Sequence, residues 1–409
     1  MAGPLSCAGH LVVRKVPHGA DQAQRLPQRL PQWLQGVRMG VLPMPAGLQE
    51  RQSAEAAVSD AAPERNHQGS YWPGGDSIKV AAMLMVVGIH VISPHFFGQI
   101  PATPPDQPFR FDIHWWVATA IDSLCRSSVP LFFMASGALL LPRAEPIGAF
   151  LRKRFVAVVV PMAAWSGFYL VWGHQIIHFA GTPPLSALPR QPAFFHLWFL
   201  YPLLLSYLAM PLMRAVFAQG GRLVGYALVL WGLAAAWMFA GNLATGNAEP
   251  GVLWPDYPYY LGYVLLGGAL ARLRGSIPLW AAGGLFGLSA AVTLLLTYVW
   301  SARLGTASEQ FMGYFAPNVA AGAMAAFLAL DGLSRRLGRA AQALIRFLGS
   351  LSFGVYAVHP VVILYLIGDT RNWFANPSLI ALAGIATVVL GSGAIAFVLS
   401  RIPLLRRLV

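Results

Sequence analysis

Long apolar runs separated by short polar breaks fill the chain from about Ser77 onward. A helix that crosses a bilayer needs about 20 predominantly apolar residues, and ten runs come near that length. The runs therefore predict an all-α fold, a polytopic membrane helix bundle of about ten transmembrane helices. They cover roughly residues 78–97, 118–141, 153–173, 194–217, 223–240, 258–272, 277–300, 313–331, 347–367 and 378–400, of which 258–272 is the shortest.

Composition supports the same fold class. Only 11% of the 409 residues are charged and 56% are hydrophobic, whereas about 25% of the residues of a soluble domain are charged. Residues 1–70 differ, since they are rich in Pro, Gln, Arg and Ala and hold no long apolar run. We predict that 1–70 is a disordered cytoplasmic tail, or a mis-assigned start of translation, and that 71–409 is one transmembrane domain.

Lysine and arginine are distributed unevenly between alternate loops. One set of loops holds fifteen of them, and the opposite set holds four, namely Arg110, Arg190, Arg303 and Arg371. Loops rich in Lys and Arg stay in the cytoplasm, so the alternation predicts an even number of spans with both termini cytoplasmic. Topology thus explains the formal net charge of +13. No nucleic-acid partner is expected, because no domain-sized basic face remains outside the lipid-soluble segments.

The first predicted span contains a cation near its start and an imidazole further along, in the stretch DSIKVAAMLMVVGIH. Lys79 and His90 are eleven residues apart, so they share one helix face and lie about 16 Å apart along the axis. Lys79 is then at the cytoplasmic boundary and His90 beyond the middle of the membrane. A lysine that reaches back to the interface and pairs with Asp76 is the structural alternative. Ionisable groups inside lipid are costly, so both are functional candidates.

Other polar side chains fall within predicted spans at comparable depths. His359 lies as deep as His90, while His196 and Asp122 lie near the outer ends of their spans. We predict that these four groups line a water-accessible cavity in the outer half of the bundle; scattered hydrogen bonds between helices are the alternative. Asp122 and Arg126 are four residues apart on one helix, and they either neutralise each other or belong to that cavity.

Two arginines, Arg152 and Arg154, stand directly before the third predicted span. Cations are unfavourable at the start of a helix, where the macrodipole is positive. Positive-inside topology explains many such clusters. A phosphate site is the sharper interpretation, because guanidinium groups match phosphate oxygens well, and Lys79 would complete that site.

Five stretches, taken together and in this order, resemble motifs of the integral-membrane acyltransferase family 3, whose members O-acylate surface carbohydrates. DSIKVAAMLMVVGIH resembles the first-helix motif, SSVPLFFMASGALLL the second-helix signature that ends in Ser-Gly, and LRKRFVAVVVPMAAW the Arg-x-Arg motif that opens the third helix. HLWFLYPLLLSYLAMP and LSFGVYAVHP resemble the fourth- and ninth-helix motifs. Lys79 stands where members of the family more often have Arg; it keeps the charge but lacks the two-pronged guanidinium.

The resemblance implies ten core helices in the cell inner membrane, surrounded by membrane lipid. It also implies an acyl-CoA donor, such as acetyl-CoA, that is loaded from the cytoplasm. The acceptor implied is a hydroxyl of a cell-envelope polysaccharide or of a lipid-linked glycan. By motif position, His90 is the catalytic histidine, and Lys79, Arg152 and Arg154 belong to the donor site. No metal is expected.

The mechanism that we predict is acetyl transfer to oxygen. The three cations hold the phosphates of acetyl-CoA, and the pantetheine arm carries the thioester along the helix to His90. Burial disfavours the imidazolium, so His90 is neutral and removes the proton from the attacking sugar hydroxyl. His196 and His359 either orient the acceptor, stabilise the oxyanion or have a structural role.

Three sets of alternatives are compatible with the sequence. Trp198, Tyr201 and Tyr356 either stack on a sugar ring or are aromatic residues of the membrane interface. The alternative to an acyltransferase is a transporter or flippase of a sugar or lipid-linked sugar that uses the same intramembrane His and Asp groups. Within the enzyme interpretation, a succinyl donor or a lipid or amine acceptor is a further alternative.

Overall fold

The computed structural model describes residues 71–99, 107–177, 182–188, 190–246, 254–367 and 377–409. These residues form helices joined by short loops, and no β-strand occurs among them, so the predicted all-α helix bundle is confirmed. The predicted tail at 1–70 lies outside the described residues and stays a prediction.

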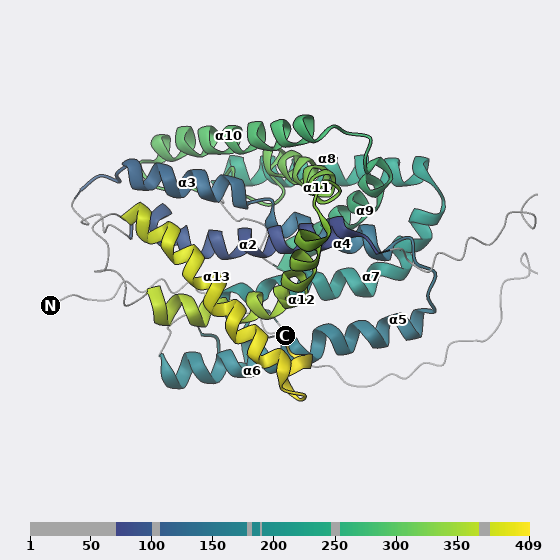
Figure 1. Ribbon diagram of the computed structural model, residues 1–409. Coiled ribbons are helices and arrows are strands. Elements are labelled where there is room, and N and C mark those ends of the chain that lie inside the picture. The colour runs from purple at the N-terminus through teal and green to yellow at the C-terminus, as the bar shows by residue number, and fades with distance from the viewer. Residues whose placement is uncertain (1–70, 100–106, 178–181, 189, 247–253, 368–376) are drawn as a thin grey trace, which may run out of the picture. The chain divides into compact units, whose positions relative to one another are not determined.

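Most of the α-helices run lengthwise through the bundle, and α13 crosses them diagonally (Figure 1). In two places consecutive helices form one longer rod: α3 runs on into α4, and a π-helix, η2 (Phe155–Val159), joins α5 to α6. The described residues thus form ten helical rods, in agreement with the ten apolar runs. The helices are α2 (Pro73–Phe96), α3 (Ile113–Cys125), α4 (Ser128–Leu140), α5 (Ile147–Arg154), α6 (Val160–Val171), α7 (Leu200–Ala218), α8 (Gly221–Thr245), α9 (Tyr260–Leu270), α10 (Leu279–Leu304), α11 (Pro317–Ser334), α12 (Arg339–Val362) and α13 (Pro377–Arg401).

Eight of the described rods are long and apolar enough to cross a membrane. The remaining two rods are α9, which has only 11 residues, and α11. Helix α9 matches the shortest predicted run and is extended at its two ends by short 3₁₀ segments, Trp254–Tyr259 and Ala271–Leu273. The eight rods are Pro73–Phe96, Ile113–Leu140, Ile147–Ile176, Phe195–Ala218, Gly221–Thr245, Leu279–Leu304, Arg339–Tyr365 and Ala381–Arg401.

Helix α9 packs against α4 through two glycines. A Cβ atom on Gly137 of α4 would lie 1.8 Å from the carbonyl oxygen of Val264 in α9, and one on Gly267 of α9 would lie 2.0 Å from the carbonyl oxygen of Met134 in α4. Small residues let the backbones of membrane helices approach closely, because lipid supplies no hydrophobic force that would otherwise press them together. The contact fixes α4 in place.

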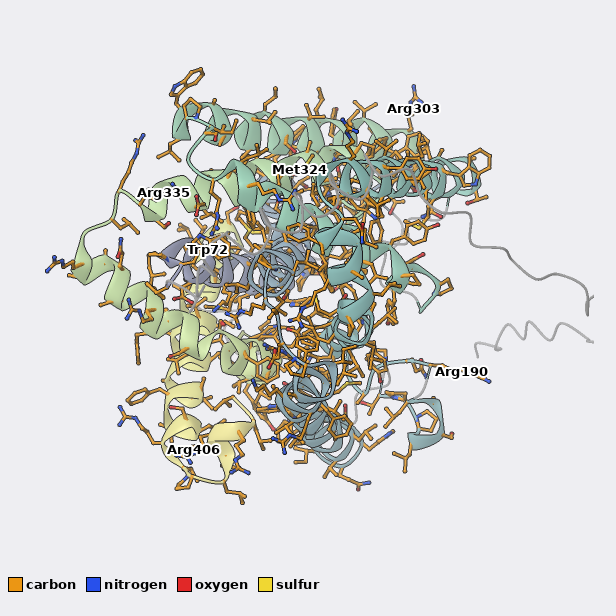
Figure 2. All side chains as sticks on the ribbon, turned by 90° about the vertical axis from the view of Figure 1, so that its right-hand side faces the viewer. Trp72, Arg190, Arg303, Met324, Arg335 and Arg406 are labelled. Carbon is orange, nitrogen blue, oxygen red and sulfur yellow. The ribbon has the colours of Figure 1, made fainter. Side chains whose placement is uncertain are left out.

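Helix α2 lies at the centre of the bundle (Figure 1) and packs against α3, α4, α11, α12 and α13. Its buried side chains belong to three separate apolar clusters, which contain Ile78, Met83 and Ile92, respectively. In Figure 2, side chains fill the space between the helices, with Trp72 and Met324 among them and Arg190, Arg303 and Arg406 at the periphery. The helix that carries Lys79 and His90 is therefore enclosed by protein on most sides.

Three of the helix ends that are predicted to be cytoplasmic contact one another. The Trp72 indole N–H donates to Asp331 at 2.6 Å, and Arg335 pairs with the same carboxylate at 2.6 Å. The Arg274 guanidinium lies 4.6 Å from the Trp72 ring centroid. These contacts join the starts of α2 and α10 to the end of α11, as the alternating topology requires. The side of the membrane that they face stays a prediction.

Candidate active site

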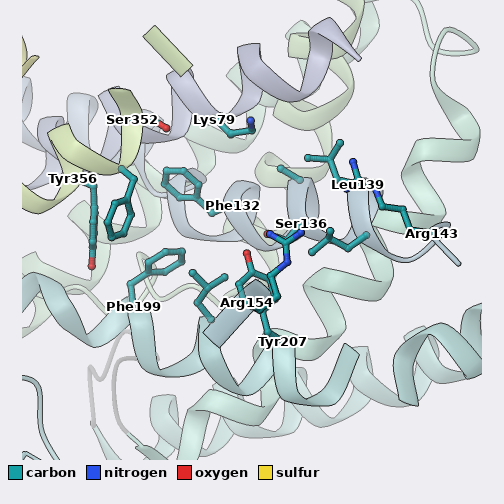
Figure 3. Close-up of a pocket in the computed structure, with 14 residues that line it drawn as sticks. Lys79, Phe132, Ser136, Leu139, Arg143, Arg154, Phe199, Tyr207, Ser352 and Tyr356 are labelled. Carbon is teal, nitrogen blue, oxygen red and sulfur yellow. The ribbon is translucent and has the colours of Figure 1, made fainter. Parts of the chain in front are cut away.

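A cavity of about 350 Å³ opens beside the first half of α2. One end is cationic, because Lys79, Arg143 and Arg154 line it, and the other end is lined by aromatic rings, including Phe199 and Tyr356 (Figure 3). The volume is in the range of small-molecule sites. Positive charge at one end and an apolar interior suit an elongated ligand with an anionic group at one end.

Arg154 is held at the cavity wall by aromatic rings. Its guanidinium carbon lies 5.5 Å from the Phe150 ring centroid and 5.4 Å from that of Tyr207, a typical cation–π arrangement. Its buried Nε atom has no hydrogen-bond partner among the described residues. The neighbouring Arg152 is exposed and lines an adjoining groove instead of this cavity. Of the two predicted arginines, the structure therefore brings only Arg154 to the cavity.

Lys79 lies at the cavity but is not a free cation. Its Nζ atom pairs with Asp76 at 2.9 Å, as the structural alternative predicts. About a third of the Lys79 side chain stays exposed (35%), and the residue also lines the cavity. The carboxylate holds the ammonium group at the start of α2, so pairing with Asp76 and binding of an anion are compatible.

A second, smaller cavity continues from the first toward His90. It has room of about 20 Å³, enough for one water molecule. Phe132, Phe199 and Tyr356 line both cavities, and His90 and Trp198 line only the second. The three shared side chains form a constriction between the cationic cavity and the imidazole. The same face of α2 thus presents Lys79 at one cavity and His90 at the next.

His90 is hydrogen-bonded to His359, and the partners determine both tautomers. His359 Nδ1 lies 2.7 Å from the Tyr356 carbonyl oxygen, and since a carbonyl only accepts, this nitrogen carries the proton. His359 Nε2 is then an acceptor, so the contact of 2.9 Å with His90 is donated by His90 Nδ1. It follows that His90 Nε2 is unprotonated and basic. This assignment comes from the hydrogen-bond network.

His196 lies beside this pair. Its ring centroid is 5.2 Å from that of His359, in an edge-to-face arrangement, and its side chain is 1% exposed. The three histidines therefore lie together, but only His90 and His196 line the smaller cavity; His359, which was predicted to line it as well, lines neither cavity. Phe195 covers His90 from another side, with its ring edge-on at 5.1 Å.

The aromatic residues singled out in the sequence have different surroundings. Trp198 lines the His90 cavity and stacks on Tyr314 with 5.7 Å between ring centroids. Tyr356 lines both cavities and donates its hydroxyl hydrogen to the carbonyl oxygen of His196. Tyr201 instead donates to the carbonyl oxygen of Leu188, away from both cavities.

Asp122 and Arg126 do not line either cavity. The Arg126 guanidinium makes two hydrogen bonds of 2.6 Å to Asp122 and also pairs with Glu309. Asp122 and Arg126 are 2% and 4% exposed, so the pair is closed to solvent. Mutual neutralisation, the structural alternative, describes them. The prediction that Asp122 shares a cavity with the histidines is not met by this arrangement, because its carboxylate is occupied by Arg126.

Two arginines near the cationic cavity were not singled out in the sequence. Arg143 lines it directly, and Arg214 lies 4.4 Å from the Phe150 ring and donates Nε to the carbonyl oxygen of Leu140. The nearby acid, Glu145, accepts a hydrogen bond from Lys153, which lowers its pKa. Both arginines belong to the loops counted for topology, and no local pattern distinguishes them from the other thirteen cations of that set.

No group of three or more His, Cys, Asp or Glu side chains suited to a metal ion occurs in the described part of the chain. A comparison with protein families finds one domain, described as an acyltransferase domain, acyltransferase family 3, which matches residues 73–397. Searches of the curated proteins and of the solved structures find no match to this chain.

Proposed function

We propose that this chain, which belongs to acyltransferase family 3, transfers an acetyl group from cytoplasmic acetyl-CoA to a hydroxyl of a cell-envelope polysaccharide sugar. Family membership and the eight described helices able to cross a bilayer make it a membrane acyltransferase. One observation carries the proposal. A cavity with cations at one end shares three lining residues with a second cavity that contains a histidine base. No observation favours a transporter or a flippase.

The donor would bind with its phosphates at Lys79, Arg143 and Arg154, where charge-assisted contacts are strong. The pantetheine arm would extend along the apolar interior of the cavity and pass the constriction at Phe132 and Tyr356. About 16 Å of helix rise separate Lys79 from the level of His90. An elongated ligand thus joins the two groups.

His90 would act as the general base. Its unprotonated Nε2 takes the proton of the acceptor hydroxyl while the hydroxyl oxygen attacks the thioester carbonyl carbon. The tetrahedral intermediate collapses, the carbon–sulfur bond breaks, and the proton passes from His90 to the sulfur, which yields the O-acetyl ester and free CoA. His359 positions His90 by accepting the Nδ1 hydrogen and does not touch the reacting atoms. General base catalysis typically contributes about 10²- to 10⁴-fold.

The acceptor would approach from the side opposite the donor, past Phe195 and Trp198. Family 3 membership and the distribution of arginines support placement in the cell inner membrane with both termini in the cytoplasm. The donor would then be loaded from the cytoplasm.

The test uses membranes from cells that express the full chain. With radiolabelled acetyl-CoA, wild-type membranes are expected to transfer label to a glycan fraction, and His90→Ala membranes to lose at least about 10²-fold of that rate. His114→Ala is the matched control, since His114 contacts Ser378 and lines neither cavity. Comparable membrane levels of both variants show that insertion is intact. Activity of His90→Ala near that of the wild type would refute the role of His90.

A further inference from the structure

A second hollow, separate from the cavities of the active site, lies on the bundle surface between α6, α12 and α13. Its volume is about 320 Å³, and its lining is entirely apolar, including Trp165, Phe168, Val361 and Leu399. In a helix bundle that crosses a membrane, an open apolar groove on this surface faces acyl chains. We call it the α6–α13 groove.

The C-terminal segment closes one end of the α6–α13 groove. Leu405 and Leu408 line it, and the Trp165 indole N–H donates to the carbonyl oxygen of Leu408 at 2.8 Å. Val409 packs so closely on α12 that a Cβ atom on Gly354 would lie 3.0 Å from the Cβ atom of Val409. The segment after α13 is therefore folded back onto the bundle and held there.

The closed end of the groove is strongly basic. Arg401, Arg406 and Arg407 are exposed around Leu405 and Leu408, and Figure 2 shows Arg406 at the edge of the C-terminal segment. None of the described residues after Asp331 is Asp or Glu. The three guanidinium groups consequently have no acidic side chain as a partner on α12, on α13 or on the C-terminal segment within the described residues.

We propose that the α6–α13 groove binds one acyl chain of an anionic phospholipid whose phosphate is held by Arg401, Arg406 and Arg407. The groove supplies apolar surface for the chain, and the arginines supply positive charge at the level where α13 leaves the membrane. Basic residues at that level attract anionic lipid headgroups. A zwitterionic lipid would fill the groove but would gain less from the three cations.

The site adjoins the hydrogen-bonded His90 and His359 through α12. Val358 and Val361 line the groove, and His359, which is buried, stands between them and contacts His90 on the opposite side. A bound chain would therefore support the turn of α12 that holds His359. Binding itself does not depend on the proposed acetyl transfer and can be tested without it.

The experiment measures lipid binding to the purified full chain in detergent by native mass spectrometry. Phosphatidylglycerol and phosphatidylcholine with identical acyl chains are added separately after delipidation. We expect the wild type to retain one phosphatidylglycerol molecule with at least about tenfold higher affinity than phosphatidylcholine, and the triple variant Arg401→Gln, Arg406→Gln, Arg407→Gln to lose that preference. The double variant Arg222→Gln, Arg336→Gln, which removes exposed arginines elsewhere, should keep it.

A second pair of variants tests the groove itself. Ala164 lines the groove, whereas the adjacent Ala163 is exposed and does not. Ala164→Trp should fill the groove and reduce retention of phosphatidylglycerol at least about fivefold, and Ala163→Trp should leave it unchanged. Both positions are exposed, so folding is expected to survive. Equal retention of the two lipids by the wild type, or equal retention by the two tryptophan variants, would overturn the proposal.

Discussion

His359 provides the most direct test of the proposed base, because it acts on His90 only through a single hydrogen bond. In His359→Leu the acceptor for the Nδ1 hydrogen of His90 is lost. A buried donor without a partner costs about 1–3 kcal/mol. The imidazole can avoid this cost by moving its proton to Nε2, the atom that must accept the hydroxyl hydrogen of the acceptor. In either case His90 no longer has both a hydrogen-bonded Nδ1 and an unprotonated Nε2, so it no longer acts efficiently as the base.

The magnitude follows from the contribution of the base. Since general base catalysis is worth about 10²- to 10⁴-fold, kcat of His359→Leu should fall by roughly that factor. The KM for acetyl-CoA should stay within about twofold, since His359 does not line the cationic cavity. In His359→Gln the amide oxygen takes the place of Nε2 and accepts from His90. This variant should therefore retain at least about tenfold more activity than the Leu variant.

The assay is transfer of radiolabelled acetyl groups by membranes adjusted to equal amounts of enzyme, with thermal unfolding in detergent to confirm that each variant is folded. A structural role for His359 alone would lower the unfolding temperature of both variants without separating their kcat values. Equal kcat for the Leu and Gln variants, or a Leu variant within threefold of the wild type, would refute the assigned hydrogen-bond direction.

Three further outcomes are expected. Arg154→Gln should raise the KM for acetyl-CoA at least about tenfold through loss of a charge-assisted contact. Arg152→Gln, which lies outside the cavity, should raise it less than about threefold. Initial rates measured against donor concentration test both variants. Gly137→Ala should abolish folding or lower the unfolding temperature markedly, because its Cβ would lie 1.8 Å from a backbone oxygen of α9. Gly167→Ala, which has open space around it, should not lower the unfolding temperature in the same experiment. Arg126→Met should lower the free energy of unfolding by about 3–5 kcal/mol, since it leaves the buried Asp122 carboxylate unpaired. A decrease of less than about 1 kcal/mol in denaturant unfolding would contradict this.

The sequence predicted the features of the fold that depend on local composition. An apolar run of about 20 residues identifies a membrane helix from the sequence alone, so ten rods could be counted, including the short α9. The helix period placed Lys79 and His90 on one face. In the structure Lys79 lines the cationic cavity and His90 lines the smaller cavity beside it. The spacing of Asp122 and Arg126 indicated their ion pair, which the structure shows.

Contacts between helices far apart in the chain could not be predicted in this way. Equal depth suggested that His359 lies near His90, but the direction of the hydrogen bond depends on the Tyr356 carbonyl group and on the rotation of α12. The helix period also explains why Arg154 lines the cavity and Arg152 does not. Residues two apart in sequence point in directions that differ by about 200° around the helix axis. The Glu309 partner of Arg126 comes from a loop beyond α10, which no local spacing identifies.

The glycine contact between α4 and α9 has a consequence for the width of the passage proposed for the pantetheine arm. Ala135 and Ser136, which line the cationic cavity, stand between Met134 and Gly137, and these two residues meet the backbone of α9. The backbone of α9 lies directly behind that wall, so the wall cannot move outward to admit a wider donor. Donor analogues with a bulkier pantetheine arm would have to be accommodated by smaller side chains elsewhere in the lining, such as at Leu203 of α7 or Phe353 of α12.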